Sequence, residues 1–97
     1  MKKLPSPIAF EWDKGNIEKN YVKHGITNKE AEEVFFNKPL KIFQDAKHSQ
    51  KEKRFLTYGV TNQKRGLTIV FTIRKQKIRA VSARDQNKKE RRIYEKE

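Results

Sequence analysis

The sequence predicts a small α+β domain: a mainly antiparallel sheet with the element order β-α-α-β-β-β-β-α and with its helices on one face. Two kinds of pattern lead to this prediction. Apolar and polar residues alternate in several short runs, most clearly within residues 67–84, as expected for half-buried strands. Thr27 with Glu30, and Asn87 with Glu90, have the spacing of capping boxes, which begin helices.

The length and the charge of the chain set bounds on its function. For residues 1–97 we expect a single domain, with residues 1–7 as a flexible arm and residues 8–95 as the folded part. Lys and Arg number 24 against 12 Asp and Glu, which gives a net charge of +12. By count, residues 1–50 carry 9 basic and 7 acidic side chains (net +2), whereas residues 51–97 carry 15 and 5 (net +10).

All the arginines lie in the second, strongly basic half of the chain. A guanidinium group is planar and binds phosphate through two parallel hydrogen bonds, which a lysine ammonium group cannot do. We therefore expect a polyanionic partner, with nucleic acid as the first candidate and an acidic protein as the second. A solvated basic surface without a ligand is the alternative.

The composition argues against several kinds of chemistry. The absence of cysteine excludes disulfides, thiolate catalysis and cysteine-based zinc sites. No cluster of His, Asp and Glu has metal-ligand spacing and no glycine-rich phosphate loop is present, so we expect no metal and no cofactor. The chain has no apolar run of about eighteen residues and no signal-peptide core, which indicates a cytoplasmic protein without membrane contact.

The first part of the chain predicts a strand followed by a helix. Ile8–Trp12 is expected to form a short strand. Asp13 is expected to cap a helix that runs to about His24, and Gly25 fits its C-terminal stop. The narrow buried stripe of this helix would consist of three apolar residues, Ile17, Tyr21 and Val22.

A second helix and two strands are expected next. The helix should run from Asn28 to about Phe36, because Pro39 makes its continuation unfavourable. Its buried residues would be Ala31, Val34 and Phe35. Leu40–Asp45 and Arg54–Thr61 are predicted strands, separated by a polar loop that contains His48 and Glu52. The second strand would have Leu56, Tyr58 and Val60 on one side.

Residues 67–84 predict a β-hairpin with Lys75-Gln76 as a two-residue loop. In that register Ile73 faces Ile78, and cross-strand partners share a face. One face would be apolar, with Ile69, Phe71, Ile73, Ile78 and Ala80. The opposite, open face would carry Thr72, Arg74, Lys77 and Arg79, with Arg84 at its far end. A charged helix, Lys88–Glu95, would follow, with Ile93 and Tyr94 as its only apolar anchors.

Short motifs along the whole chain follow one another in a characteristic order. The first half contains Phe10-Glu11-Trp12-Asp13, Lys23-His24-Gly25-Ile26, Glu30-Ala31 and Val34-Phe35. The second half contains Arg54-Phe55, Gly59, a hydrophobic strand ending at Thr72, Arg79 with Val81-Ser82-Ala83-Arg84, and Glu90-Arg91 with Tyr94. In this order and spacing, over about residues 10–95, the sequence resembles the BrnT family, toxins of type II toxin–antitoxin pairs.

The resemblance implies a RelE-like microbial ribonuclease fold and an RNA-cleaving activity that stops translation. It also implies a cognate antitoxin of the BrnA type, which neutralises the toxin by direct binding and represses their shared operon through its own DNA-binding half. Two positions depart from the family pattern. Lys53 stands where the family often has an acid, and the hairpin turn Arg74-Lys75-Gln76-Lys77 lacks the usual glycine.

Metal-independent RNA cleavage requires three actions at the ribose 2′-hydroxyl and its phosphate. A base removes the hydroxyl proton, cations stabilise the added charge on the phosphate, and an acid protonates the leaving 5′-oxygen. Arg74 and Arg79 on the open face are the first candidates for phosphate stabilisation, with Arg54 on the neighbouring strand. Each of these arginines could instead be a surface side chain paired with a nearby acid.

Proton transfer has two candidates, Glu52 and His24. Glu52 precedes Lys53 and Arg54, and these two cations could hold either a catalytic carboxylate or a plain salt bridge. An imidazole titrates near neutral pH, which suits His24 for acid–base catalysis, but a histidine at a helix end also serves as a C-terminal cap.

Further contacts to RNA are expected from five residues, Lys53, Lys77, Arg84, Arg91 and Tyr94. Tyr94 could instead simply anchor the last helix to the core. Trp12 and Tyr58 could stack on bases, although packing is the commoner role of aromatic residues in a small core. Three functions remain open: an endoribonuclease toxin, a non-catalytic RNA- or DNA-binding module, and a partner protein whose basic face receives an acidic antitoxin.

Overall fold

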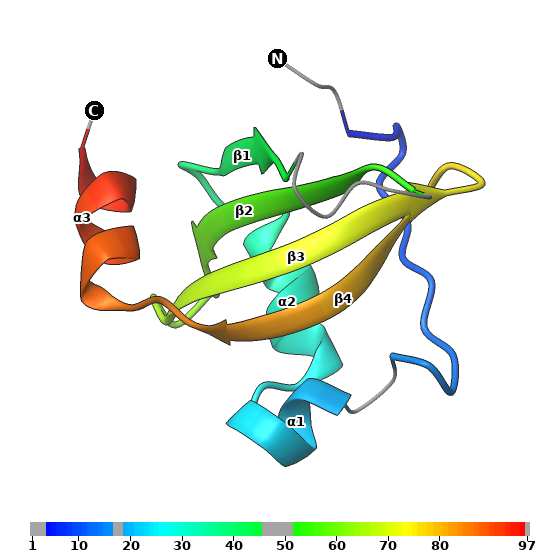
Figure 1. The fold of residues 1–97 in the computed structure, drawn as a ribbon, viewed down its shortest axis with the longest axis horizontal. Coiled ribbons are helices and arrows are strands. Elements are labelled where there is room, and N and C mark those ends of the chain that lie inside the picture. The colour runs from blue at the N-terminus through cyan, green and yellow to red at the C-terminus, as the bar shows by residue number, and fades with distance from the viewer. Residues whose placement is uncertain (1–3, 17–18, 46–51, 97) are drawn as a thin grey trace.

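Four antiparallel strands form one sheet in the order β1-β2-β3-β4 (Figure 1). The computed structural model describes residues 4–16, 19–45 and 52–96. The strands are β1 (Lys41–Gln44), β2 (Arg54–Val60), β3 (Gly66–Arg74) and β4 (Lys77–Asp85). The helices are α1 (Lys19–His24), α2 (Asn28–Val34) and α3 (Lys88–Glu95), and none of these is long and apolar enough to cross a bilayer. The α+β class and the predicted element order from the first helix onward are confirmed.

The segment before α1 differs from the prediction. In place of a strand at Ile8–Trp12, Phe10 forms an isolated parallel bridge with Ile78 of β4. Backbone hydrogen bonds of 2.8 and 2.9 Å on either side of Phe10 join the segment to Ile78. The pairing extends no further because the chain turns immediately afterwards, at Asp13. The segment therefore lies along the β4 edge of the sheet.

The first helix is shorter than predicted and does not begin at Asp13. The helix α1 has only six residues, and Asp13 accepts a hydrogen bond of 2.8 Å from a backbone N–H two residues later. The predicted burial of Tyr21 and Val22 is wrong, since both side chains are exposed, and Ile17 lies outside the described residues. Gly25 ends the helix as predicted, with a φ of 67° that glycine adopts without strain.

The helix α2 covers one face of the sheet and closes the core (Figure 1). The predicted capping box is present: the Thr27 side chain accepts from the Glu30 N–H, and the Glu30 side chain accepts from the Thr27 N–H. The helix ends at Val34, two residues before the predicted end at Phe36, and Phe35 caps it. The buried core consists of Ile26, Ala31, Val34, Phe35, Phe55, Leu67, Ile69, Phe71, Ile78, Ala80 and Ala83.

Gly59 of β2 lies directly beneath α2. A Cβ atom at this position would lie 2.5 Å from Val34 Cγ1 and 3.2 Å from Leu40 Cδ1. We expect Gly59→Ala to lower the free energy of unfolding by about 1–3 kcal/mol in urea titrations, because the helix has to move away from the sheet. Val34→Ala removes the clashing methyl groups, so the double variant should lose less than the sum of the two single variants. Strictly additive losses would contradict this packing explanation.

The β3–β4 hairpin has the predicted register. Arg74 lies opposite Lys77 and Ile73 lies opposite Ile78, with Lys75-Gln76 as the loop. The two loop residues have φ values of 51° and 68°. Positive φ at both positions is what a type I′ turn requires, and this chain achieves it without glycine.

A β-bulge in β4 changes which side chains share a face. The register shifts between Val70 and Phe71 of β3, so that Val81 has no residue opposite to it. Arg79 and Arg84 are five positions apart and would point to opposite faces of a regular strand. Because of the extra residue, both pair with even-numbered residues of β3, which face away from the core. We call this side of the sheet, opposite α2, the open face.

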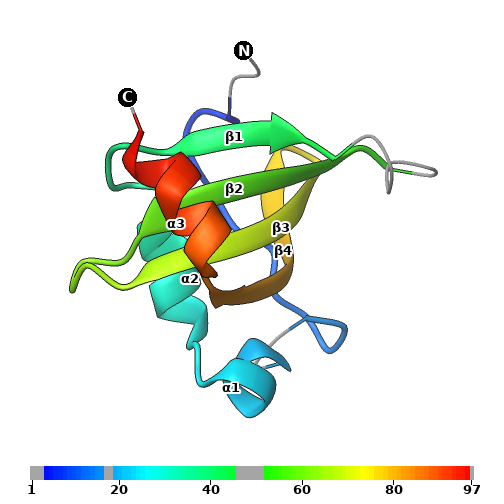
Figure 2. The ribbon, with the colours of Figure 1, turned by 60° about the vertical axis from the view of Figure 1, so that its left-hand side comes forward.

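The helix α3 packs on one end of the open face (Figure 2), so the prediction that all helices share one face is wrong. The Tyr94 hydroxyl donates to the Pro39 carbonyl at 2.6 Å, and the Glu90 carboxylate accepts from the Thr68 hydroxyl at 2.9 Å. The physical reason is that apolar side chains of β2 also point to this side and require cover. These side chains are Leu56, Tyr58 and Val60.

Candidate active site

Four cationic side chains lie on the open face near the β3–β4 turn. Arg54 of β2, Thr72 of β3 and Arg79 of β4 are opposite one another and form one row across three strands. Arg74 and Lys77 form the next row toward the turn. The prediction that Arg74 and Arg79 share the open face is therefore confirmed. We call Arg54, Arg74, Lys77 and Arg79 the cationic cluster.

In the part of the chain that the structure describes, three carboxylates bind the guanidinium groups of Arg74 and Arg79. Asp13 accepts two hydrogen bonds from Arg79, of 2.8 and 2.9 Å, and Glu52 accepts two from Arg74, of 2.9 and 3.0 Å. Glu11 lies between them, 3.3 Å from the Arg79 guanidinium and 3.8 Å from that of Arg74. Among the described residues, these carboxylates offset the charge of Arg74 and Arg79 in the free protein.

The ion pairs favour the charged form of the Asp13 and Glu52 carboxylates. The hydrogen bond from Arg79, and after it one from the Gly15 N–H, holds the pKa of Asp13 below its usual value. The hydrogen bond from Arg74 lowers the pKa of Glu52 in the same way. Asp13 is 52% exposed, and exposed ion pairs contribute little to stability because water and salt screen them. An incoming phosphate can therefore take the place of these carboxylates.

The pattern of residues around Asp13 and Glu11 does not predict that these two acids lie at this site. Asp13 fits a helix cap by its position, and the structure shows that this prediction is wrong. Both acids reach Arg79 only through the bridge between Phe10 and Ile78, which is a contact between distant parts of the chain. One feature of the sequence does indicate where the Glu11 side chain lies. Glu11 stands between Phe10 and Trp12, and in an extended segment its side chain points to the side opposite these two rings.

Thr72 occupies the middle of the row between Arg54 and Arg79. Its side chain is 1% exposed, and within the described part of the chain its hydroxyl has no hydrogen-bond partner. Thr68, on the same strand and face, donates to Glu90 instead. A buried hydroxyl without a partner is unfavourable. Because the hydroxyl is also covered, it can donate to an anion between the two arginines only when the side chains over it move.

A pair of isosteric changes tests whether this hydroxyl is free. We expect Thr72→Val to leave the free energy of unfolding unchanged, or to raise it by up to about 1 kcal/mol, because an unsatisfied group is removed. Thr68→Val should lower it by about 1–3 kcal/mol, because Glu90 loses a donor. Urea titrations of both variants measure the difference. Equal losses at the two positions would mean that Thr72 has a partner in the folded protein.

Three of the predicted RNA-contacting residues belong to the α3 region. Arg84 donates two hydrogen bonds of 2.7 Å to Glu90, and Tyr94 is buried with its hydroxyl bonded to Pro39. Both side chains therefore hold α3 on the sheet. Arg91 is exposed on the same helix. Contacts of these three residues with RNA remain predictions.

Lys53 lies beside the cluster rather than in its rows. The residue is exposed just before β2, next to Glu52. Together with Glu52, Phe55 and Ile73 it lines a hollow of about 380 Å³. Phe55 and Ile73 point to the α2 side of the sheet, so the hollow lies on the other side from the cationic cluster, and Glu52, which binds Arg74, links the two.

His24 is separated from the cluster. Its backbone carbonyl accepts a hydrogen bond of 3.3 Å from Arg65, and Arg65 binds Asp85 through two further hydrogen bonds. Asp85 is the last residue of β4, at the end of the sheet opposite the turn that follows Arg74. The structure thus brings Glu52, but not His24, into contact with the predicted phosphate-binding arginines.

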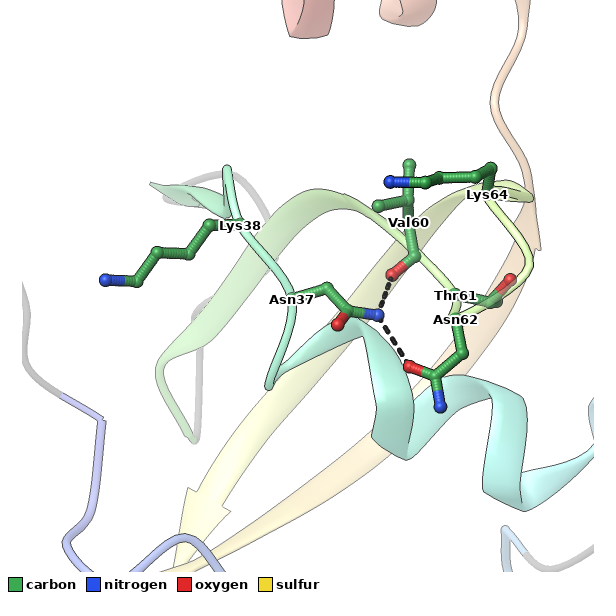
Figure 3. A pocket seen from close by; sticks show the side chains of 6 residues that line it. All are labelled: Asn37, Lys38, Val60, Thr61, Asn62 and Lys64. Carbon is green, nitrogen blue, oxygen red and sulfur yellow. Dashed lines mark hydrogen bonds between the residues drawn. The ribbon is translucent and has the colours of Figure 1, made fainter.

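A second pocket, of about 210 Å³, lies at the other end of β2 (Figure 3). The Asn37 side chain donates to the Val60 carbonyl at 3.0 Å and to the Asn62 side chain at 2.9 Å. The Asn62 N–H donates to the Glu33 carboxylate at 3.0 Å. Because these polar groups form hydrogen bonds with one another, we interpret the pocket as part of the contact between α2 and the β2–β3 turn.

The fold and the cluster together define a class of protein: a small basic α+β domain whose open sheet face presents arginines suited to phosphate-bearing ligands. Within the described ranges, no group of three or more His, Cys, Asp or Glu could hold a metal ion. The chain belongs to the BrnT family, since the family model described as "Ribonuclease toxin, BrnT, of type II toxin-antitoxin system" matches residues 12–90. This match confirms the resemblance seen in the motifs. A comparison with curated proteins gave no match.

Proposed function

We propose that this chain is the toxin of a type II toxin–antitoxin pair and that it acts as an endoribonuclease without a metal ion. The observation that carries the proposal is the row of Arg54, Thr72 and Arg79, with Arg74 beside it, in a member of a ribonuclease toxin family. Such a row offers several fixed donors to one phosphate group. A RelE-like fold is part of the proposal, and the antiparallel sheet with α2 on one face agrees with it.

RNA binding begins with an exchange of partners at the cluster. A phosphate group displaces Asp13 from Arg79 and Glu52 from Arg74, because phosphate is a strong bidentate partner of arginine. When Glu52 leaves Arg74, the main cause of its lowered pKa is removed, and the carboxylate becomes a better proton acceptor. Glu52 then serves as the general base for the ribose 2′-hydroxyl.

Cleavage follows from the attack of the 2′-oxygen on the adjacent phosphorus. The bond from phosphorus to the 5′-oxygen breaks, and the products are a 2′,3′-cyclic phosphate and a 5′-hydroxyl. The leaving 5′-oxygen takes a proton from solvent water, and Glu52 returns to solvent the proton that it removed from the 2′-hydroxyl. Arg74, Arg79 and Arg54 stabilise the negative charge that builds up on the phosphate oxygens. The cut RNA can no longer be translated.

A toxin of this kind requires a neutralising partner. We propose a BrnA-type antitoxin that covers the open face, with acidic side chains in place of the RNA phosphates. Lys77, exposed beside Arg74, would take part in this contact as well as in RNA binding. Operon DNA would be contacted only through the antitoxin.

The test is incubation of the purified, antitoxin-free protein with RNA and a chelator, followed by mapping of the fragment ends. We expect cleavage in the presence of the chelator, with 2′,3′-cyclic phosphate and 5′-hydroxyl ends. RNA binding should weaken steeply with salt, because phosphate contacts release counterions. Intact RNA, or cleavage that the chelator abolishes, would contradict the proposal. Tight binding without cleavage would favour the alternative, a non-catalytic RNA-binding module.

A further inference from the structure

An exposed aromatic ring lies on the open face next to the cationic cluster. Among the described residues five large apolar side chains are exposed, and Phe43 is the one that projects from a strand. Phe43 is 40% exposed and lies opposite Leu56 of β2, which points to the open face. A single exposed apolar side chain is ordinary on a protein surface, so it is the neighbours of this ring that point to a ligand.

The ring of Phe43 is held in place from one side. Its centroid lies 5.3 Å from that of Tyr58, and the two rings are inclined by 59°. Tyr58 is itself only 7% exposed, on the side of the sheet that α3 partly covers. A ring supported by a buried neighbour is already ordered before a ligand binds, which lowers the entropic cost of binding.

The ring and the cluster are close enough to bind parts of one ligand. Phe43 lies opposite Leu56, and Arg54 precedes Leu56 by two residues on the same strand. Diagonal neighbours of this kind in an antiparallel pair are roughly 7–8 Å apart. Between the ring and the arginine row runs an apolar strip formed by Leu56 and its partner Val70. The surface thus offers a ring, an apolar strip and a guanidinium group in succession.

We propose that Phe43 stacks on an unpaired base of single-stranded RNA while Arg54 holds a phosphate of the same strand. The inference rests on the proposed function, since it takes RNA as the ligand. The guanidinium groups of Arg74 and Arg79, whose carboxylate partners are exposed and can be displaced, favour a polyanion over an apolar peptide as the occupant of this face. The base has to be unpaired, because bases inside a duplex stack on one another and cannot reach a protein ring.

The test uses a short single-stranded 2′-O-methyl RNA, which lacks the nucleophile and is not cleaved, with one 2-aminopurine as a fluorescent base. Stacking on Phe43 quenches this fluorescence, and we expect Phe43→Ala to abolish the quenching and to weaken RNA binding about tenfold. Binding of inorganic polyphosphate, which has no bases, should not change. Phe43→Tyr should keep both effects. Phe36→Ala, which removes an exposed ring beyond the end of α2, is the matched control and should change neither.

The possible results separate this inference from the proposed function. It is overturned if Phe43→Ala leaves RNA binding and quenching intact, or if it weakens RNA and polyphosphate binding equally. It is also overturned if Phe43→Ala keeps RNA binding but no longer binds a partner protein, because the ring would then belong to a protein interface. If the wild-type protein quenches 2-aminopurine through Phe43 but cleaves no unmodified RNA, the stacking site stands and the nuclease proposal fails.

Discussion

Replacement of Arg79 by alanine should lower the rate of RNA cleavage at least about 100-fold, because loss of one fixed donor to a developing oxyanion typically has this effect. Arg79 lies in the row with Thr72, and its side chain is only 14% exposed, so it is held more firmly than the neighbouring Arg74. Single-turnover cleavage at saturating RNA measures the effect on the chemical step. The thermal unfolding curve of the variant should remain cooperative, since its main partner, Asp13, is on the surface.

Arg65→Ala is the matched control for this experiment. Arg65 also binds an aspartate through two hydrogen bonds, of 2.7 and 3.1 Å to Asp85, but it lies at the opposite end of the sheet. The Arg65→Ala variant should be less stable than the wild-type protein, but its cleavage rate per folded molecule should be unchanged. Asp13→Asn weakens the ion pair of Arg79 from the other side and should also keep cleavage. Full activity of the Arg79 variant, or equal inactivation by all three changes, would contradict a role for Arg79 at the phosphate.

Replacement of Glu90 by glutamine should lower the free energy of unfolding at pH 7 by about 3–4 kcal/mol. Two hydrogen bonds from Arg84, with others from the Asn87 N–H and the Thr68 hydroxyl, lower the pKa of Glu90 to about 2, against the effect of burial. The difference from an ordinary glutamate pKa of 4.5 is about 2.5 units, and each unit corresponds to about 1.4 kcal/mol.

The same linkage fixes the pH dependence of this effect. The folded pKa lies below the unfolded one, so the stabilisation by Glu90 is complete above about pH 4.5 and is lost as the pH falls toward about 2. Urea titrations across this range should show the wild-type protein approaching the Glu90→Gln variant in stability. Glu95→Gln, an exposed change on the same helix, should stay close to wild type at every pH. If the free energies of unfolding of the wild-type protein and Glu90→Gln differed by a constant amount down to pH 2, the ionised Glu90 carboxylate would not be the source of the stabilisation.

The parts of the fold that depend on local patterns could be predicted from the sequence. The alternation around Lys75-Gln76 gave the hairpin register, and with it the shared face of Arg74 and Arg79. The capping boxes that begin at Thr27 and Asn87 marked the starts of α2 and α3. In each case residues a few positions apart contact one another, so the pattern carries the information.

The parts that depend on contacts between distant residues could not be predicted in this way. The side on which α3 packs follows from β2, where the apolar Leu56 and Tyr58 point away from the core and so create a second surface to cover. The carboxylates of Glu11 and Asp13 reach Arg79 only because their segment pairs with Ile78. Neither outcome is visible in alternation or spacing, because each depends on which faces meet after the chain folds.

The unpaired Val81 can be removed without changing which side chains of β4 share a face. Without it, Arg79 and Arg84 would be four positions apart and would point to the same face of a regular strand. Every later residue of β4 would keep its partner, with Arg84 still opposite Thr68. One residue inserted into the paired part after Val81 would instead move Arg84 opposite Leu67, on the side of the hydrophobic core. We therefore expect β4 to accept the loss of one residue at the bulge more easily than the gain of one beyond it.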